Sequence, residues 1–198
     1  MLPPQTAPGA TPITRLLTAS LLAAPLISLA ATSLYAARGW EDAGAGVLHV
    51  LGAIGYGFVA LAVASSLGRE SRLAALLLVF GLVGMAGNVA YGFDTIHQSF
   101  GETPLVDRDG AAVVLKVLGL FFPLALLAAG VGLYRLGHRT RAAAVALAAV
   151  AFPIAHIGNI AELALPVDVV LTLAFGSLVL GRADSEVRAG GPAPAPIR

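Results

Sequence analysis

Six polar side chains interrupt long apolar stretches of this 198-residue chain, and their chemistry defines the first candidate site. They are His49, Asn88, Lys116, His156, Asn159 and Glu162. An ionisable or amide group within an apolar helix is costly unless it finds a partner or water. We therefore expect these residues to line an outward-facing polar pocket in the outer leaflet, with a small molecule or a cation as its ligand.

Two of the histidines allow a second chemistry. Neutral imidazole is a good iron ligand, and equal depth on different helices is the arrangement that bis-histidine ligation requires. His49 and His156 fit this pattern, so haem b between them is the alternative hypothesis. A bundle with two haems would need four such histidines, and His97 and His138 are badly placed. The leading interpretation includes no cofactor.

The elements that must position these residues follow from composition. The chain is 58% hydrophobic and only 12% charged, with a mean hydropathy of +0.86, whereas soluble domains are roughly one-quarter charged. Charged residues are absent or rare in five runs, residues 16–37, 43–68, 73–93, 110–134 and 142–181. Because a spanning helix needs about 20 residues, each of the first four runs predicts one crossing.

The fifth run is 40 residues long, roughly twice the thickness of the hydrocarbon layer as a single helix, so it must turn back. Proline suits the first position of a helix and an acid suits its positive end, which places the turn at residues 165–168. The predicted fold is all-α, a bundle of six transmembrane helices over residues 13–182 with a short sixth helix. Residues 1–12 and 183–198 are rich in Pro, Gly and Ala and are expected to be disordered tails.

Three short segments recur in the same order along the chain. Residues 47–52 resemble 114–119, residues 68–72 resemble 137–141, and residues 87–90 resemble 158–161. A collinear pattern of this kind predicts an internal two-helix repeat, helices 2–3 and helices 4–5. Asn88 and Asn159 should then occupy equivalent turns of the two hairpins.

Depth and direction bring the polar residues into one layer. With a rise of 1.5 Å per residue, His49 and Lys116 lie about 9 Å below the outer boundary, and His156 lies at a similar depth of about 8 Å. In this scheme His156, Asn159 and Glu162 share one face of helix 5 at a spacing of three. Their side chains tilt toward the membrane centre, so His156 and Glu162 should face the interior of the bundle.

The basic residues orient the chain. Six crossings place nine arginines on one side, and two arginines and Lys116 on the other, while most of the acids fall on the side with few basic residues. The positive-inside rule then predicts a multi-pass protein of the cell membrane with both termini in the cytoplasm. A single arginine and a long apolar core fit an uncleaved first helix better than a signal peptide.

Composition and missing motifs exclude several functions. A net charge of +1 without a basic stripe argues against nucleic acid, and the lack of cysteine excludes disulfides and thiolate metal sites. Nucleotide-binding, hydrolase and zinc-protease signatures are missing, so an enzyme is the less favoured reading. Three functions stay open: a small binding, transport or sensing module, the haem b redox protein, and a structural or accessory subunit. Besides the lipid bilayer, a second copy or a larger membrane complex is a possible partner.

Topology can be tested because the chain has no cysteine. Leu105→Cys should react with an impermeant maleimide added outside whole cells, and Gly190→Cys should react only after the cells are permeabilised. Labelling of residue 190 from outside, or of residue 105 only from the cytoplasm, would refute the scheme.

Overall fold

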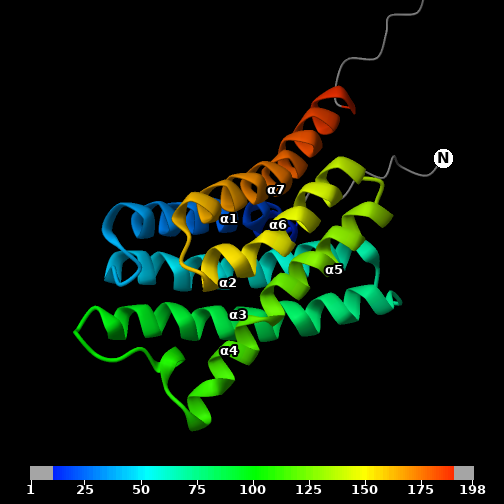
Figure 1. Cartoon of the computed structure of the whole chain (residues 1–198). Helices are drawn as coiled ribbons and strands as arrows, with labels where there is room; N and C mark the ends of the chain where they lie inside the picture. Colours follow the sequence, from blue (N-terminus) through cyan, green and yellow to red (C-terminus); the bar gives the residue numbers. More distant parts are fainter. Residues whose placement is uncertain (1–10, 190–198) are drawn as a thin grey trace, which may run out of the picture.

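The computed structural model describes residues 11–189, with side chains to residue 181, and all regular structure in this range is helical (Figure 1). The α-helices are α1 (Pro12–Arg38), α2 (Ala43–Leu67), α3 (Arg72–Gln98), α4 (Val113–Gly119), α5 (Phe121–Arg135), α6 (Arg139–Ile157) and α7 (Ala161–Ala189). Two short 3-10 turns, Leu105–Asp107 and Gly110–Ala112, lie between α3 and α4. The predicted all-α class is confirmed.

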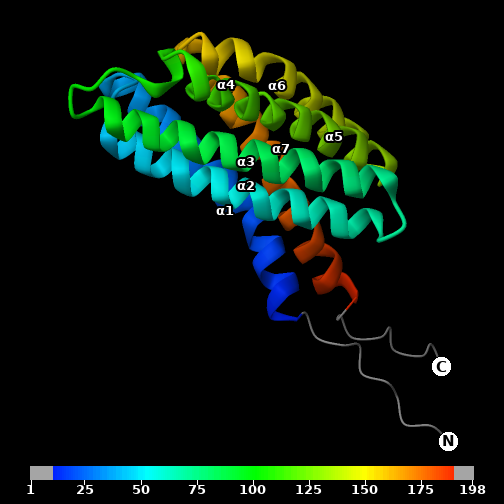
Figure 2. The ribbon, with the colours of Figure 1, turned by 90° about the horizontal axis from the view of Figure 1, so that it is seen from below.

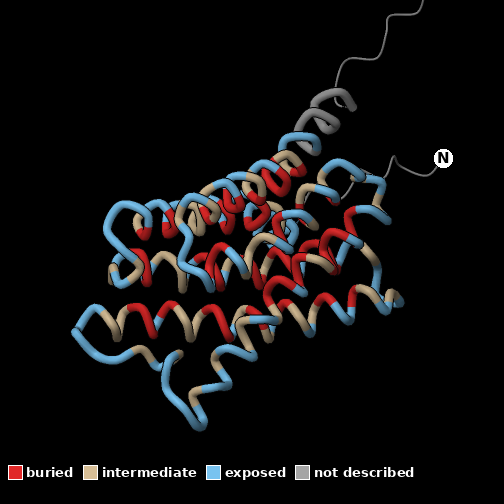
Figure 3. The backbone as a smooth tube through the Cα atoms, in the orientation of Figure 1, coloured by how far each residue is buried: buried red, intermediate tan, exposed pale blue. Residues whose placement is uncertain are grey.

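Six stretches of the described chain are long and apolar enough to cross a bilayer, which confirms the predicted number of crossings. The fourth, Gly110–Arg135, contains both α4 and α5, and the sixth is Ala161–Gly181. Large apolar side chains such as Leu147 and Leu173 stay 70% and 67% exposed, as a surface in contact with lipid would be. Figure 3 shows the buried residues on the inward sides of the helices.

The helices form a closed ring. Neighbours around it follow the order α1, α2, α3, α5, α6, α7, and α7 returns to pack on α1. Figures 1 and 2 show that α1 begins and α7 ends at the same end of the bundle, which we call the terminal end. The α1–α2 turn, the α6–α7 turn and the connection 99–112 lie at the opposite end, the loop end.

A buried acid anchors the longest connection. Asp94, near the end of α3, is 0% exposed, and its carboxylate accepts hydrogen bonds from the backbone N–H groups of Leu105 at 2.7 Å and Val106 at 3.0 Å. These bonds satisfy the carboxylate and hold the first 3-10 turn against α3. The connection is therefore fixed to the bundle.

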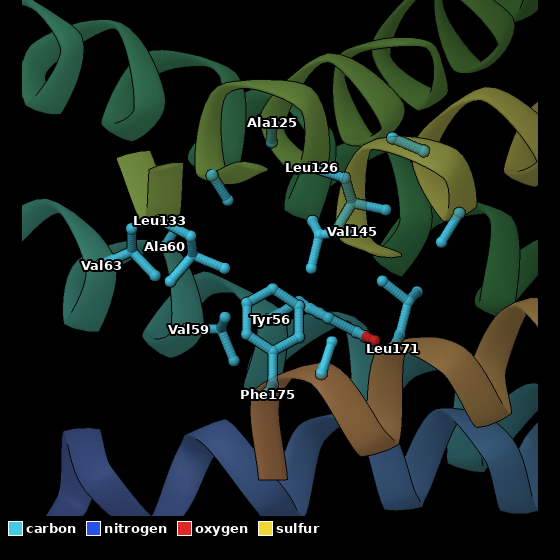
Figure 4. Packing of buried hydrophobic residues seen from close by; sticks show 14 of the residues in the cluster. Tyr56, Val59, Ala60, Val63, Ala125, Leu126, Leu133, Val145, Leu171 and Phe175 are labelled. Atoms are coloured by element: carbon cyan, nitrogen blue, oxygen red, sulfur yellow. The ribbon is translucent and has the colours of Figure 1, made fainter. Parts of the chain in front are cut away.

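The core between the helices is built from small aliphatic and aromatic residues. Figure 4 shows Tyr56 and Phe175 among Val59, Ala60 and Leu171. Where α3 passes the junction of α4 and α5, only glycine fits: a Cβ on Gly87 would lie 2.4 Å from the carbonyl carbon of Leu118. Small residues let helix backbones approach closely in a membrane, where the hydrophobic effect does not drive helices together.

The predicted turn at residues 165–168 is wrong. α6 ends at Ile157, the chain turns at residues 158–160, and Pro166 lies inside α7. Asn159 takes the left-handed conformation with φ of 52°, which asparagine adopts more readily than most residues, and the N–H of Ile160 bonds back to the carbonyl of Ala155. This turn comes earlier than predicted, so the sixth helix is long.

The ends of the chain differ in part from the predicted tails. α7 continues to Ala189 and so includes part of the segment 183–198. α1 begins at Pro12, the last residue of the other predicted tail. Residues 1–10 and 190–198 lie outside the described part of the chain.

The repeat agrees with the structure at one of its three segments. Gly68 and Gly137 both end the first helix of a hairpin, with φ of 85° and 88°. Asn88, however, lies within α3, whereas Asn159 lies in the turn after α6, so the prediction that they occupy equivalent turns is wrong. Segment 114–119 also differs, because it forms most of the separate helix α4 while its counterpart lies within the continuous helix α2.

Close contact at Gly87 predicts a large effect of a single methyl group. Gly87→Ala should lower stability by about 1–3 kcal/mol, because the backbone of the α4–α5 junction must move away. Gly119→Ala is the matched control, since its Cβ meets nothing within 4 Å. Thermal unfolding in detergent measures both, and equal midpoints for the two variants would contradict the packing described.

Candidate functional site

A buried carboxylate forms the centre of the site. Asp168, in the second turn of α7, is 1% exposed, and its Oδ2 accepts a hydrogen bond of 2.5 Å from the hydroxyl of Thr32. Thr32 lies on α1 and is 2% exposed. The bond joins the first and last spanning helices, which are neighbours only because the ring closes.

His156 approaches the same carboxylate from α6. Its Nε2 lies 3.7 Å from Oδ2 of Asp168, which is too long for a hydrogen bond. Neither ring nitrogen has a hydrogen-bond partner among the described residues, although the side chain is more than nine-tenths buried. A buried polar atom without a partner costs about 1–3 kcal/mol, so this imidazole is poised to take up one.

Aromatic rings hold the imidazole in place. Phe152 stacks on His156 with centroids 4.1 Å apart, and Trp40 meets it edge-on at 6.1 Å. Trp40 belongs to the α1–α2 turn, and its ring stacks in turn on the ring of Tyr35, with centroids 4.9 Å apart. The histidine is therefore fixed between α6 and the loop end of α1.

His49 belongs to a second polar pair. Its Nε2 lies 3.3 Å from Oδ1 of Asn88, and the amide nitrogen of Asn88 donates to the carbonyl of Gly84 at 2.9 Å. Because that second bond orients the amide, its oxygen accepts from the imidazole, and Nε2 of His49 carries the proton. In the neutral form the other nitrogen, Nδ1, is an acceptor.

The two pairs share one small cavity to which all six spanning segments contribute. Its lining residues are Ser28, Thr32, His49, Ala53, Tyr56, Asn88, Phe122, Phe152, His156 and Asp168. The volume is ≈ 20 Å³, which is enough for about one water molecule. The hydroxyl of Tyr56 is buried beside it without a hydrogen-bond partner among the described residues.

A second cavity toward the terminal end is different in character. Tyr56 and Phe122 line both cavities, but the other residues around the second one are apolar or glycine. They are Val59, Ala60, Leu77, Gly81, Ala125, Leu126, Ala129 and Phe175. Among the residues that line the two cavities, the polar groups therefore stop at the level of Tyr56.

Three of the six predicted site residues meet and three do not. His49, Asn88 and His156 line the cavity, as the sequence suggested. Lys116, Asn159 and Glu162 are exposed and lie outside it. Lys116 lies on α4, which buries none of its residues. The shared face predicted for His156, Asn159 and Glu162 does not exist, because the helix ends between them.

The sequence reasoning missed the central acid. Asp168 was assigned to a turn at the surface, whereas it lies one to two turns inside α7. The dipeptide Gly158-Asn159 is the signal that would have placed the turn correctly, since glycine and asparagine commonly end helices. Thr32, Ser28 and Tyr56 carry no such signal, because single hydroxyls are common in apolar helices.

Haem b does not fit this site as it stands. A cavity of ≈ 20 Å³ is far smaller than the roughly 300 Å³ or more that cofactor pockets need. The stacked Phe152 and the neighbouring Asp168 also occupy the space beside His156. Among the described residues, no group of three or more His, Cys, Asp or Glu side chains is arranged to hold a metal ion.

Comparison with protein-family models, with curated proteins and with solved structures finds no match. What the site does must therefore be inferred from its own geometry and chemistry.

The bond between Thr32 and Asp168 predicts strong coupling. Thr32→Val keeps the shape of the side chain but removes the donor, and should lower stability by about 1–3 kcal/mol because the carboxylate loses its only hydrogen-bonded side chain. Adding Asp168→Leu should recover most of that loss, since an apolar pair leaves nothing unsatisfied. A double-mutant cycle of unfolding free energies measures the coupling, and simple additivity of the two changes would contradict it.

Proposed function

We propose that this chain is a multi-pass protein of the cell membrane that binds a small polar species or cation from the outer side, as a binding or sensing module. The observation that carries the proposal is the cavity at the loop end, where Asp168 faces an imidazole and a phenol hydroxyl that have no hydrogen-bond partners in the described structure. Polar and ionisable groups of this kind are costly to bury, and they are unusual in a membrane bundle unless they serve a function.

Charge supports the choice of ligand. Asp168 is the only acid that lines the cavity, and no lysine or arginine lines it. With neutral imidazoles the cavity has a formal charge of −1, or of zero when the acid is protonated, so it favours a cation or a hydrogen-bond donor over an anion.

Charge also supports the orientation. The turns 68–71 and 136–138 lie at the terminal end, and Arg69, Arg72, Arg135, Arg139 and Arg141 lie in or beside them. The loop end carries Glu41, Asp42, Glu102, Asp107 and Asp109. By the positive-inside rule the terminal end, where α1 begins and α7 ends, faces the cytoplasm, and the loop end, which is nearer to the polar cavity, faces the outer side.

The apolar second cavity argues against translocation. A charged species that passed Tyr56 and Phe122 would meet a stretch lined by Val59, Leu77 and Leu126, with no polar side chain to replace its hydration. Binding at the loop end followed by a change in helix packing is therefore better supported than passage through the bundle.

Access to the cavity can be tested with a probe of atomic size. Ser28→Cys places a thiol in the polar cavity, and Ag⁺ added outside should modify it and block later labelling by a maleimide in denaturant. Val59→Cys, in the apolar cavity, is the matched control and should react much more slowly. Equal protection of both thiols would refute an outward-open polar site and leave an accessory or structural role as the better account.

A further inference from the structure

We infer that the species exchanged at this site is the proton, taken up by His156 and held there by Asp168. The inference rests on the proposed function and narrows its ligand to one chemistry. It starts from the size of the cavity, which at ≈ 20 Å³ admits about one water molecule and no larger ligand. Water brings protons to a site without needing further space.

The geometry is that of a histidine–carboxylate ion pair in which the imidazole has not yet gained its proton. Nε2 of His156 and Oδ2 of Asp168 are 3.7 Å apart, about 1 Å longer than a charge-assisted hydrogen bond. A neutral imidazole with both nitrogens unpartnered gains little from this neighbour. When hydronium transfers a proton to Nε2 of His156, an N–H bond forms, an O–H bond of the hydronium breaks and water is released. The imidazolium then donates its new N–H to the carboxylate of Asp168.

Among the residues that line the cavity, Asp168 is the only carboxylate near His156, and His49 is the only other group that can become a cation. α7 contributes Asp168, and α2 contributes His49 and Tyr56. α1, α3 and α5 contribute Thr32, Asn88 and Phe122, none of which is charged. Trp40, from the α1–α2 turn, meets the ring edge-on and carries no charge. Asp168 is thus the only counter-charge available.

Pairing would also change the packing of the bundle. α6 and α7 are joined by the short turn 158–160, and they already pack on one another. Closing the gap between His156 and Asp168 draws the end of α6 toward α7 and shifts the imidazole against Phe152 and Trp40. Proton uptake from the outer side becomes a movement of helices that span the membrane, which is what a sensor of external pH requires.

The chain contains its own reporter of this event. Trp40 is the only tryptophan, and its ring centroid lies 6.1 Å from that of His156. A protonated imidazole quenches an indole in contact with it, whereas a neutral one quenches it much less. The fluorescence of the full-length protein should therefore fall as the external pH is lowered and His156 gains its proton.

Variants separate His156 from the other titrating groups. His156→Gln should abolish the pH-dependent quenching. His138→Gln, at the opposite end of the same helix, and Glu41→Gln, beside the tryptophan, should retain it. Asp168→Asn should move the midpoint down by about one pH unit or more, a tenfold weaker proton affinity, because the counter-charge is lost. Circular dichroism checks that each variant is folded.

Two results would overturn the inference. One is a titration that persists in folded His156→Gln, or fluorescence that does not change with pH. The other is a response at fixed pH when Na⁺ is replaced by K⁺ or choline, which would assign the site to a metal cation. If His156→Gln fails to fold, ¹⁵N-histidine spectra of the His97→Gln, His138→Gln chain decide. That chain keeps only His49 and His156, and one of these two imidazoles must gain a proton as the pH is lowered. Ag⁺ access to Ser28→Cys tests whether the cavity is open to the outside, independently of pH. A cavity that is open but insensitive to pH would refute the proton inference and leave the proposed binding site standing.

Discussion

The hydrogen bond between Asp168 and Thr32 is the interaction on which the loop half of the bundle depends. A bilayer cannot solvate a carboxylate, so α7 can cross only if a neighbour provides a donor. Thr32 is that neighbour, and its position on α1 requires the last spanning helix to return to the first. The closed ring then encloses a cavity to which every spanning segment contributes.

Small residues let the helices of the ring pack so closely that single side chains determine the distances between them. On α3, Gly84 and Gly87 admit the backbone at the α4–α5 junction, and on α2, Gly52 lies against Ser28 of α1. The helices therefore approach at glycine and alanine, and the larger rings of Tyr56, Phe122 and Phe175 fill the centre. In such packing a movement of about 1 Å at one polar pair cannot be absorbed locally and passes to the neighbouring helices.

The sequence predicted the number and class of the elements well because both depend on the length of apolar runs, which the bilayer dictates directly.

It predicted the site only in part. His49 and His156 were found because histidine is rare in such runs, but the partner of His156 was not. Pro166 and Asp168 together look like the start of a helix, yet the turn was set by Gly158 and Asn159, which outweigh them because Asn159 can take a left-handed conformation. Nor does the sequence show that α4 breaks away from α5 and leaves Lys116 exposed, because that break depends on how closely α3 approaches.

Tyr56 and Phe122 separate the polar cavity from the apolar one, and this boundary limits what the polar cavity can do. If hydrophilic groups had continued toward the terminal end, the buried charges could be explained as steps along a path. Instead, among the residues that line the two cavities, the phenol of Tyr56 carries the polar atom nearest the terminal end, and its ring packs edge-on to Phe122 at 5.0 Å. Under the proposed function, a charge that enters the cavity would leave the way it came, and its binding energy would act on the helices that surround the cavity. Those helices run to the terminal end, where α6 begins with Arg139 and Arg141 bonds to Ser177 of α7. The same two helices that hold His156 and Asp168 are thus bonded again at the opposite end, which under the proposed function would carry a change at the site along the length of the bundle.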